Sequence, residues 1–321
     1  MTTTRDLPGQ PPHGLDLDRI AAARTTIDPV FLNSPQYVDD HLCGRLGRRV
    51  LTKIETLNPL RSFKGRGADL YVGGLPAGHT VVCGSGGGNF GQAIAYAARR
   101  HGLHAEVFVP AGTSELKTRR MAAFGARVHR VDGPHKQHAA DHAAAAPDRH
   151  FAVDGRDAAI SEGAGTIGAE LLDSATPFDT LLVPVGDGAL ITGIAAWIKA
   201  HAPRVRVIGV TSAAAPALER SWRTGRPHTV QQRPTIAAGI SIRRPEPEAV
   251  TRTRALVDDM LLIDDDALLD AMRLTADTLG ILLEPAGAAA IAAITAHDVP
   301  GDTIAAVLTG ANADPAHYRT P

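Results

Sequence analysis

Lys64 is the first residue of this sequence whose type and position could do chemistry. It lies in the segment Asn58-Pro59-Leu60-Arg61-Ser62-Phe63-Lys64-Gly65-Arg66-Gly67-Ala68, shortly after a strand-like run, Arg49 to Glu55. Asn58-Pro59 ends the strand because the residue before a proline avoids the helical region. Ser62 is then expected to cap a helix, which places Lys64 in the first helical turn.

A cation in a first helical turn opposes the helix dipole, whose positive end lies there. A lysine in that position either extends into solvent or has lost its charge. A neutral lysine is a nucleophile that forms a Schiff base with an aldehyde. Solvated lysines are common, so Lys64 alone does not decide between the two interpretations, and the rest of the chain has to support one of them.

Two glycine-rich segments each separate a predicted strand from a predicted helix, and their sequences are Gly84-Ser85-Gly86-Gly87-Gly88-Asn89 and Gly186-Asp187-Gly188-Ala189-Leu190. Such a turn directs backbone N–H groups and a helix N-terminus at one point, which favours an anion. The second turn is the candidate phosphate site, although a tight turn without a ligand explains it equally well. The first is the candidate site for a carboxylate, with Asn89 as a side-chain donor.

The second glycine turn differs from the common nucleotide-binding patterns. It lacks the Lys-Ser/Thr ending of a P-loop, which argues against ATP. It also lacks the full Rossmann fingerprint, which weakens the case for a dinucleotide. The predicted anion is therefore a phosphate of some other ligand.

Composition excludes several other classes of protein. The 321 residues carry 33 basic and 34 acidic side chains, for a formal net charge of -1. This balance gives no support for binding nucleic acid or an anionic membrane. No apolar run reaches membrane-spanning length. Residues 1–20 are expected to form a flexible tail, because residues 1–13 are polar and proline-rich and lack an apolar signal core.

Cysteine and histidine usage favours no metal or disulfide site. The two cysteines, Cys43 and Cys83, give no disulfide framework and no metal cluster, and they favour a reducing cytoplasm. His135, His138 and His142 share an Ala-rich predicted helix. No cysteine or carboxylate pattern accompanies them, so they are expected to be solvated rather than metal-binding.

The elements that must position these residues alternate between strand and helix. The predicted strands cover residues 49–55, 79–83, 105–110, 126–131, 180–185, 206–211 and 303–309. The predicted helices cover residues 20–24, 92–101, 114–124, 135–146, 164–172, 191–202, 213–224, 249–258, 265–278 and 286–296, besides the helix of Lys64. This alternation predicts an α/β protein of parallel sheets and crossover helices. The length exceeds that of one usual hydrophobic core, so two lobes are expected.

The lysine segment and the asparagine turn, together with three further segments, resemble motifs of the fold-type II pyridoxal-phosphate-dependent enzymes, the tryptophan-synthase-β-like group. Within that group the chain is most similar to the threonine/serine dehydratases, from about Ile27 to Asp314. The matching segments are Ser62-Phe63-Lys64-Gly65-Arg66-Gly67-Ala68, Gly88-Asn89-Phe90-Gly91-Gln92, Glu162-Gly163-Ala164-Gly165-Thr166-Ile167, Glu284-Pro285-Ala286-Gly287-Ala288-Ala289 and Thr309-Gly310-Ala311-Asn312. Agreement of several motifs in one order is much more specific than any single motif.

The resemblance implies a two-lobed fold in which each lobe is a mostly parallel twisted sheet flanked by helices. Residues 1–80 and 159–321 would form a large cofactor-binding domain. Residues 81–158 would form a small mobile domain that carries the asparagine loop. The resemblance also implies a cytoplasmic homodimer that acts on a small amino acid.

The family's site residues transfer to this sequence one by one. Lys64 would hold pyridoxal 5'-phosphate as a Schiff base and then remove the α-proton of the substrate. Asn89 would hydrogen-bond the phenolate oxygen of the cofactor, Thr309 its pyridine nitrogen, and Gly239 would line the other face of the ring. The phosphate would be held by Gly186, Asp187, Gly188, Ala189 and Leu190, and the substrate carboxylate by Ser85, Gly86, Gly87, Gly88 and Asn89. No metal ligand can be assigned.

The function that this resemblance implies is β-elimination from a β-hydroxy amino acid such as threonine, serine or a modified analogue, giving a 2-oxo acid and ammonia. The alternative is a cysteine-synthase-like β-replacement through an aminoacrylate. The Arg66 version of the lysine motif favours elimination, because cysteine synthases carry a Lys-Asp-Arg core. A non-enzymatic cofactor-binding protein is a third class, disfavoured by the presence of both Lys64 and Asn89.

Some positions depart from the family pattern. Gly86 stands where dehydratases commonly carry a hydroxyl, and Gly87 where serine racemases carry a catalytic serine, so racemisation is disfavoured. The missing hydroxyl leaves room for a bulkier or modified β-hydroxy amino acid, and plain threonine is less strongly expected than the family alone implies. Asp187 replaces a glycine of the phosphate loop, and its charge must point away from the phosphate. Ala238 replaces an acidic residue common before the Gly239 equivalent.

Other charged residues near the motifs receive structural interpretations. Arg66 is expected at the surface or between the lobes, Lys117 at the entrance of the site, and Glu284 at a helix start. No regulatory domain is expected after Asp314, and feedback control by isoleucine is not expected.

Overall fold

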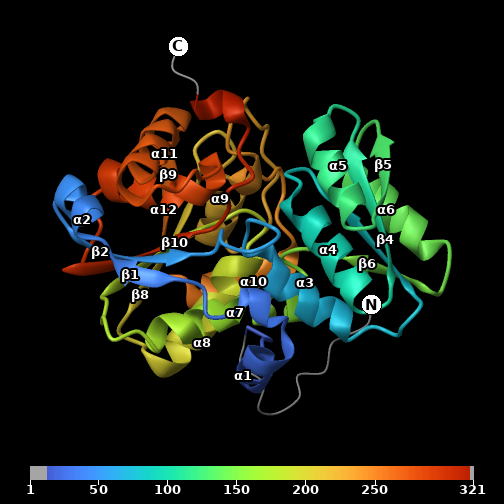
Figure 1. Cartoon of the computed structure of the whole chain (residues 1–321), viewed down its shortest axis with the longest axis horizontal. Helices are drawn as coiled ribbons and strands as arrows, with labels where there is room; N and C mark the ends of the chain where they lie inside the picture. The colour runs from blue at the N-terminus through green and yellow to red at the C-terminus, as the bar shows by residue number, and fades with distance from the viewer. Residues whose placement is uncertain (1–12, 319–321) are drawn as a thin grey trace.

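The computed structural model describes residues 13–318 of the chain, which build two β-sheets flanked by helices (Figure 1). The larger sheet has the strand order β1-β2-β10-β7-β8-β9. Its strands are β1 (Gln36–Val38), β2 (Arg49–Ile54), β7 (Thr180–Pro184), β8 (Arg206–Ser212), β9 (Asp259–Ile263) and β10 (Thr303–Leu308). Only β1 is antiparallel to its neighbour.

The smaller sheet has the order β5-β4-β3-β6, and all of its strands run parallel. Its strands are β3 (Thr80–Gly84), β4 (His104–Pro110), β5 (Arg127–Val131) and β6 (Arg149–Ala152). The chain therefore leaves the large sheet after β2, builds the small sheet, and returns with β7. The prediction of mostly parallel sheets with crossover helices is confirmed.

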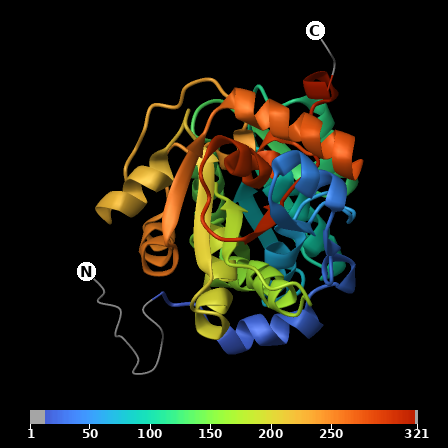
Figure 2. The same ribbon diagram turned by 90° about the vertical axis from the view of Figure 1, so that its left-hand side faces the viewer.

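Helices cover both faces of the large sheet. One face carries α1 (Leu17–Thr26), α7 (Ala158–Leu172), α8 (Ala189–His201) and α10 (Pro247–Leu256), and α9 (Ala217–Thr224) lies next to α10. The opposite face carries α2 (Asp40–Leu46), α11 (Asp265–Leu279) and α12 (Pro285–Ala296). In Figure 2, α11 lies above the sheet, while α8 and α1 lie below it.

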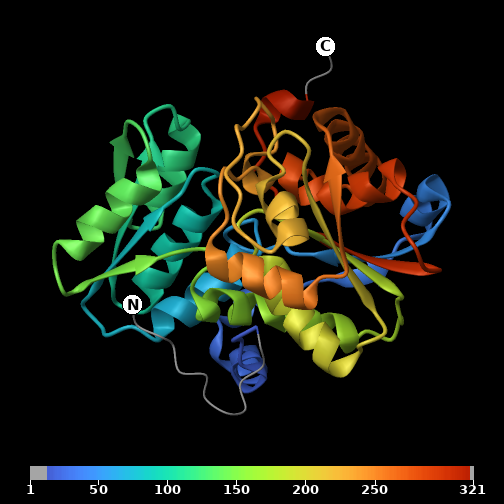
Figure 3. The same cartoon turned by 180° about the vertical axis from the view of Figure 1, so that it is seen from behind.

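The small sheet is covered by α4 (Asn89–Arg100) and α5 (Glu115–Ala123) on one face and by α6 (His135–Ala144) on the other. The helix α3 (Lys64–Gly73) packs against both α4 and α7. It therefore lies where the two sheets meet, and Figure 3 shows the two bodies side by side from behind. Short 3₁₀ turns occur at Pro29–Phe31, Ala238–Ile240 and Pro315–Tyr318.

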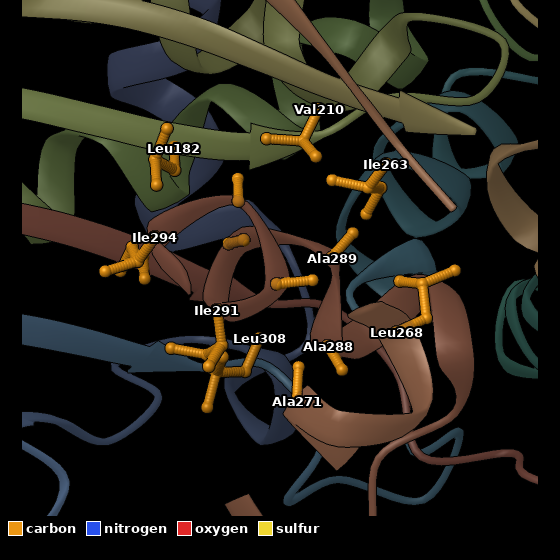
Figure 4. Packing of buried hydrophobic residues seen from close by; sticks show 14 of the residues in the cluster. Leu182, Val210, Ile263, Leu268, Ala271, Ala288, Ala289, Ile291, Ile294 and Leu308 are labelled. Carbon is orange, nitrogen blue, oxygen red and sulfur yellow. The ribbon is translucent and has the colours of Figure 1, made fainter. Parts of the chain in front are cut away.

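Small aliphatic side chains let the helices approach the sheets closely, as expected for a chain with only 4% aromatic residues. In Figure 4, Ala289 of α12 lies towards Val210 and Ile263 of the sheet, and Ala288 lies towards Ala271 and Leu268 of α11. Between α7 and α8 the contact is closer still, because a side chain on Gly193 would lie 1.8 Å from the carbonyl oxygen of Ser161. The core is therefore built by backbone proximity rather than by large rings.

Four elements were not predicted from the sequence: β1, α2, β6 and β9. The strand β6 is short and begins with Arg149 and His150, so it lacks an apolar run. The strand β9 follows α10 with only two residues between them, and the predicted helix 249–258 extended over that gap. Helix α7 begins six residues before the predicted start at Ala164. The differences in α7 and α10 lie at element ends, where local patterns are least informative.

The predicted tail is wrong in its last part. Residues 1–12 lie outside the described residues. From there on the chain is packed: Leu15 is 1% exposed and Ile20 is fully buried against the core of the large sheet. Asp16 caps α1 by accepting from the N–H groups of Asp18 and Arg19. The apolar side chains at positions 15 and 20 anchor this segment.

The described part of the chain contains no helix long and apolar enough to cross a lipid bilayer. The small sheet occupies residues 80–152, and the strands of the large sheet lie on either side of it in the sequence. That residues 81–158 move as one small domain stays a prediction.

Candidate active site

Hydrogen bonds of the segment before α3, residues 58–63, fix the position of Lys64. The Asn58 side chain accepts from the N–H of Leu60 and donates to the carbonyl oxygen of Ser62. The N–H of Phe63 donates to the carbonyl oxygen of Thr309 at 3.1 Å. The segment before α3 is thus tied to the residues that follow β10, and Lys64 becomes the first residue of α3.

The prediction that Ser62 caps this helix is wrong. Phe63 occupies the N-cap position without a side-chain cap, and Ser62 instead forms an isolated bridge to Gly310. The buried Ser62 hydroxyl oxygen has no hydrogen-bond partner among the described residues, so it caps no N–H group of α3.

One cavity collects all the predicted site residues. Its lining includes Lys64, the first glycine turn from Ser85 to Asn89, the second from Gly186 to Leu190, and also Gly239 and Thr309. Its empty volume is about 930 Å³, including the open mouth. It lies at the carboxyl ends of β3, β7 and β10, where ligands bind in open parallel sheets. The roles assigned to the individual residues stay predictions.

Lys64 has a partner that the sequence analysis missed. Its Nζ donates a hydrogen bond to Oδ2 of Asp154 and lies 4.6 Å from the centre of the Phe63 ring. Asp154 is only 6% exposed, and its Oδ1 has no partner in the described part of the chain. A buried carboxylate oxygen without a donor is costly and points to a role in binding. Asp154 follows β6, so recognising that strand would have found it.

The first glycine turn joins β3 to α4. Gly88 is the N-cap of α4 with φ +97°, a conformation that favours glycine. The Ser85 hydroxyl accepts from the N–H of Gly91 at 3.0 Å, so this side chain stabilises the turn. Asn89 donates to Glu284 Oε1 at 2.6 Å and accepts from Asn312 Nδ2 at 2.8 Å. The Asn89 amide is therefore held in one orientation, with one N–H left for a ligand.

Glu284 does more than mark a helix start. Its side chain is half-buried beside Asn89, and burial raises its pKa, while the hydrogen bond from Asn89 and the charge of Lys117 act in the opposite direction. A raised pKa favours the uncharged acid.

The second glycine turn fits a phosphate group. Gly188 is the N-cap of α8 with φ +98°, and no side chain caps this helix. The free N–H groups of its first turn therefore face the cavity. A side chain on Gly186 would lie 2.4 Å from the carbonyl oxygen of Gly239, so the backbones meet directly here. Both features suit an anion held mainly by backbone donors.

Asp187 of this turn is neutralised across the junction of the two sheets. Its Oδ1 accepts from Lys136 Nζ at 2.7 Å, and Lys136 belongs to α6 of the small sheet. The charge of Asp187 raises the pKa of Lys136, and burial acts against it. The charge of Asp187 was expected to point away from a phosphate, and in the structure its side chain is paired with Lys136. Lys136 was not predicted.

Thr309 and Gly239 close the remaining sides. Thr309 is 5% exposed, and its hydroxyl lies 3.4 Å from the Ala286 carbonyl oxygen. So long a contact leaves the proton free to reorient. A side chain on Gly239 would lie 2.8 Å from the Ala286 side chain, so only glycine leaves space there. Gly239 therefore leaves an open slot in the cavity, whose lining also includes the Thr309 hydroxyl.

The prediction for Arg66 is wrong. Its side chain is fully buried, not at the surface, and it donates to Glu55, Glu170 and Thr166. Lys53 joins the same group through a 2.6 Å bond to Glu170. Paired charges can be buried when all their hydrogen bonds are made, and sequence alone does not show that these partners meet.

The histidines of α6 also differ from the prediction. His138 is exposed, but His135 and His142 are half-buried. His142 Nε2 lies 3.2 Å from Glu106 and its ring packs beside Phe108, while His135 lies against Gly86 in the first turn. The described residues hold no group of three or more side chains suited to a metal ion.

A comparison with protein families decides the identity of this cavity. Residues 36–310 match the model of the pyridoxal-phosphate-dependent enzymes. The chain belongs to this family. Members of the family depend on pyridoxal phosphate, and the uncapped α8 N-terminus, the slot beside Gly239 and the Lys64 amine fit its phosphate, ring and aldehyde. The fold-type II prediction is confirmed.

Individual relatives point to one branch of the family. The chain is 32% identical over 279 residues to the biosynthetic L-threonine dehydratase of Pasteurella multocida, covering 84% of this chain and 54% of the relative. It is 29% identical over 306 residues to the L-threonine ammonia-lyase of Thermotoga maritima, covering 94% and 76%. The chain spans only about half the length of several of these curated relatives.

A solved structure extends this likeness to the whole fold. The crystal structure of a T.th. threonine deaminase superposes with a TM-score of 0.86 at 31% identity, covering 95% of this chain and 100% of that one. The cavity described above therefore lies in a scaffold that the relatives share.

Proposed function

We propose that this protein catalyses β-elimination from a β-hydroxy amino acid such as threonine or serine, giving a 2-oxo acid and ammonia. The observation that carries the proposal is the meeting of Lys64, both glycine turns and Thr309 around one cavity. The relatives named threonine dehydratase and threonine ammonia-lyase support the same reaction class. The lysine motif with Arg66 fits this class better than β-replacement.

Each residue then has a distinct task. Pyridoxal phosphate, when bound, supplies an electron-withdrawing ring that acidifies the α C–H bond of an attached amino acid. Lys64 binds the aldehyde and afterwards takes the α-proton at its Nζ. The backbone of Gly186–Leu190 holds the phosphate, and Thr309 donates to the ring nitrogen. Gly239 leaves room for the ring.

The first glycine turn orients the substrate. Backbone N–H groups of Gly86, Gly87 and Gly88 receive the α-carboxylate next to Ser85, whose own N–H donates to the Phe108 carbonyl oxygen. Asn89 uses its free N–H for the cofactor oxygen. Fixing both ends of the amino acid holds the α C–H bond towards Lys64, and such orientation contributes several kcal/mol to catalysis. The small side chains of this turn leave space for a substituent on the β-carbon.

We further propose that the protein works as a cytoplasmic homodimer. The resemblance to fold-type II enzymes implies this state. Two unpaired cysteines, Cys43 and Cys83, suit a reducing compartment. Sedimentation of the holoenzyme tests the assembly, because a monomer would sediment at the mass of one 33.6 kDa chain.

The direct test of the reaction uses the holoenzyme with threonine or serine and no second nucleophile. Ammonia and 2-oxo acid are expected in equal amounts. Product that forms only after sulfide or another nucleophile is added would show β-replacement instead. If the bound cofactor spectrum does not respond to any amino acid, both proposals fail.

A further inference from the structure

A second cavity opens from the mouth of the first. It shares Gly86, Gly87, Asn89 and Glu284 with the first cavity and extends between α5, residues 235–239 and residues 312–317. A ligand whose α-carboxylate lies on the first glycine turn would therefore direct any larger substituent towards this second space. The side chains that line it then decide which substituent is accepted.

Two cations of α5, Lys117 and Arg120, line this second cavity, and both are half-buried. They are three residues apart, so they lie on one side of the helix. Within residues 13–318, neither has a carboxylate within 4.0 Å, whereas Arg130, which contacts the same helix, is paired with Glu115. Asp314 lines the cavity too, but it is exposed and accepts from the N–H of Ala316.

Arg120 is fixed in place by a chain of hydrogen bonds that starts in the first cavity. Its Nη1 donates to Asn312 Oδ1 at 2.6 Å. Asn312 donates to Asn89 at 2.8 Å, and Asn89 donates to Glu284 at 2.6 Å. Only Nη1 is used in this way. Nε and Nη2 of Arg120 have no hydrogen-bond partner in the described part of the chain.

The surroundings of Arg120 favour an anion. Burial and the neighbouring charge of Arg61 lower its pKa, and the charge of Glu284 acts in the opposite direction. A guanidinium with free N–H donors binds a carboxylate through two parallel hydrogen bonds. An oriented, half-buried arginine without an acid partner is thus a prepared carboxylate site.

There is also room between this arginine and the first glycine turn. A side chain on Gly87 would meet no atom closer than 3.8 Å, and one on Gly86 would meet only His135, at 3.6 Å. The missing hydroxyls at these positions leave space next to the predicted α-carboxylate site. A second carboxylate on the β-carbon of the substrate would point into that space.

We propose that the preferred substrate is a β-hydroxy amino acid with a second carboxylate on its β-carbon, and that Arg120 binds this carboxylate with the help of Lys117. The inference rests on the proposed β-elimination. For 3-hydroxyaspartate, the α C–H and β C–O bonds break and water leaves. The enamine that remains becomes an imine when a proton moves from its nitrogen to the β-carbon. Water then adds to the imine and ammonia leaves, giving a 2-oxo dicarboxylic acid. The overall change needs no oxidant or reductant.

The test compares two substrates in three variants of the holoenzyme. The quantity measured is kcat/KM for 3-hydroxyaspartate divided by kcat/KM for threonine. We expect this ratio to exceed one in the unchanged protein and to fall roughly 10- to 100-fold in Arg120→Gln, as for the loss of a charge-assisted hydrogen bond. Arg120→Lys should recover only part of it, because an ammonium lacks the planar fork. Arg119→Gln, an exposed neighbour on α5, should leave the ratio unchanged.

A readout without turnover separates recognition from structure. Malonate, which has two carboxylates and no amino group, should inhibit the unchanged protein more strongly than acetate, and Arg120→Gln should remove most of that difference. Equal losses of kcat/KM for both substrates would overturn the proposal, since Arg120 would then act on the α-carboxylate or on stability. Activity with threonine but none with 3-hydroxyaspartate would overturn it and leave the β-elimination standing. Elimination from neither substrate would refute the β-elimination itself.

Discussion

Lys64 and Arg66 lie two residues apart on α3. The charged groups around them differ in how many of their hydrogen bonds are made. Around Arg66, the side chains of Lys53, Glu55 and Glu170 form a sealed network, with no more than 5% exposure at any charged side chain. Around Lys64, the partner carboxylate of Asp154 keeps one buried oxygen without a donor among the described residues. The first group closes on itself, and the second faces the cavity.

This difference indicates which buried charges stabilise the fold and which ones are available to a ligand. A buried charge network with all its bonds made holds α3 against β2 and α7, and it leaves nothing for a ligand. A buried group with a bond missing carries a cost that the fold alone does not recover, and such costs are typical of sites that bind something. The same contrast separates Arg120, with free donors, from Arg66, which spends its donors on Glu55, Glu170 and Thr166.

Breaking the sealed network should give the largest effect on stability. In Glu170→Gln, the buried charges of Arg66 and Lys53 lose their main partner, and the free energy of unfolding near pH 7 should fall by about 3–5 kcal/mol. Asp173→Asn is a matched control, because its ion pair with Arg24 is solvent-exposed, and a change below about 1 kcal/mol is expected there. Urea unfolding of both variants measures the difference.

The same network predicts a pH dependence. Burial opposes ionisation of Glu170, but the bonds and charges of Arg66 and Lys53 outweigh it and lower the pKa to about 2. A lowered pKa stabilises the fold above the ordinary value near 4.5, and this stabilisation, about 3 kcal/mol, is lost as the pH falls from there towards 2. The gap between the unchanged protein and Glu170→Gln should therefore close in acid. A constant gap from pH 7 to pH 3 would contradict this account.

Changing the open group should affect chemistry instead. Asp154→Asn keeps the shape of the side chain and removes the negative charge beside Lys64. We expect the rate of elimination to fall roughly 10- to 100-fold, or about 1.4–2.8 kcal/mol in the barrier, with thermal stability unchanged or slightly raised. Steady-state kinetics and a melting curve together decide. Loss of stability with full activity would place Asp154 with the sealed network.

The smallest effect is expected at the pair that joins the two sheets. Lys136 and Asp187 are 2.7 Å apart, but their side chains are 41% and 20% exposed. Solvent screens such a pair, so a double-mutant cycle with Lys136→Met and Asp187→Asn should give a coupling energy below about 1 kcal/mol. Asp187 raises the pKa of Lys136, so the coupling is present at neutral pH and lost as the pH rises above the ordinary lysine value of about 10.5.

Sequence reasoning located the parts of the site that depend on local pattern. The two glycine turns and Thr309 each follow a strand that the sequence also predicted, and Lys64 begins the predicted helix α3, so these local patterns located the residues that line the cavity. The residues that it missed depend on contacts between distant segments. Asp154 follows a strand with no apolar run, and Lys136 reaches Asp187 only because the two sheets meet.

The errors have the same physical origin. Arg66 was expected at the surface or between the lobes, since charged side chains are rarely buried, and only the folded structure shows that Glu55 and Glu170 converge on it. Arg120 belongs to none of the sequence motifs. It was recognised only in the structure, because it has no acidic partner among the described residues. Patterns along the chain predict helices and strands well. Which charged side chain pairs with a buried charge depends on the whole fold.

The most direct test of the central claim is to identify the lysine that carries the cofactor. The holoenzyme is reduced with borohydride, digested, and analysed by mass spectrometry for the peptide with the pyridoxyl label. The account predicts a single label on Lys64, absent in Lys64→Ala. A label on Lys136 or Lys117, or a protein that never takes up the label, would contradict it.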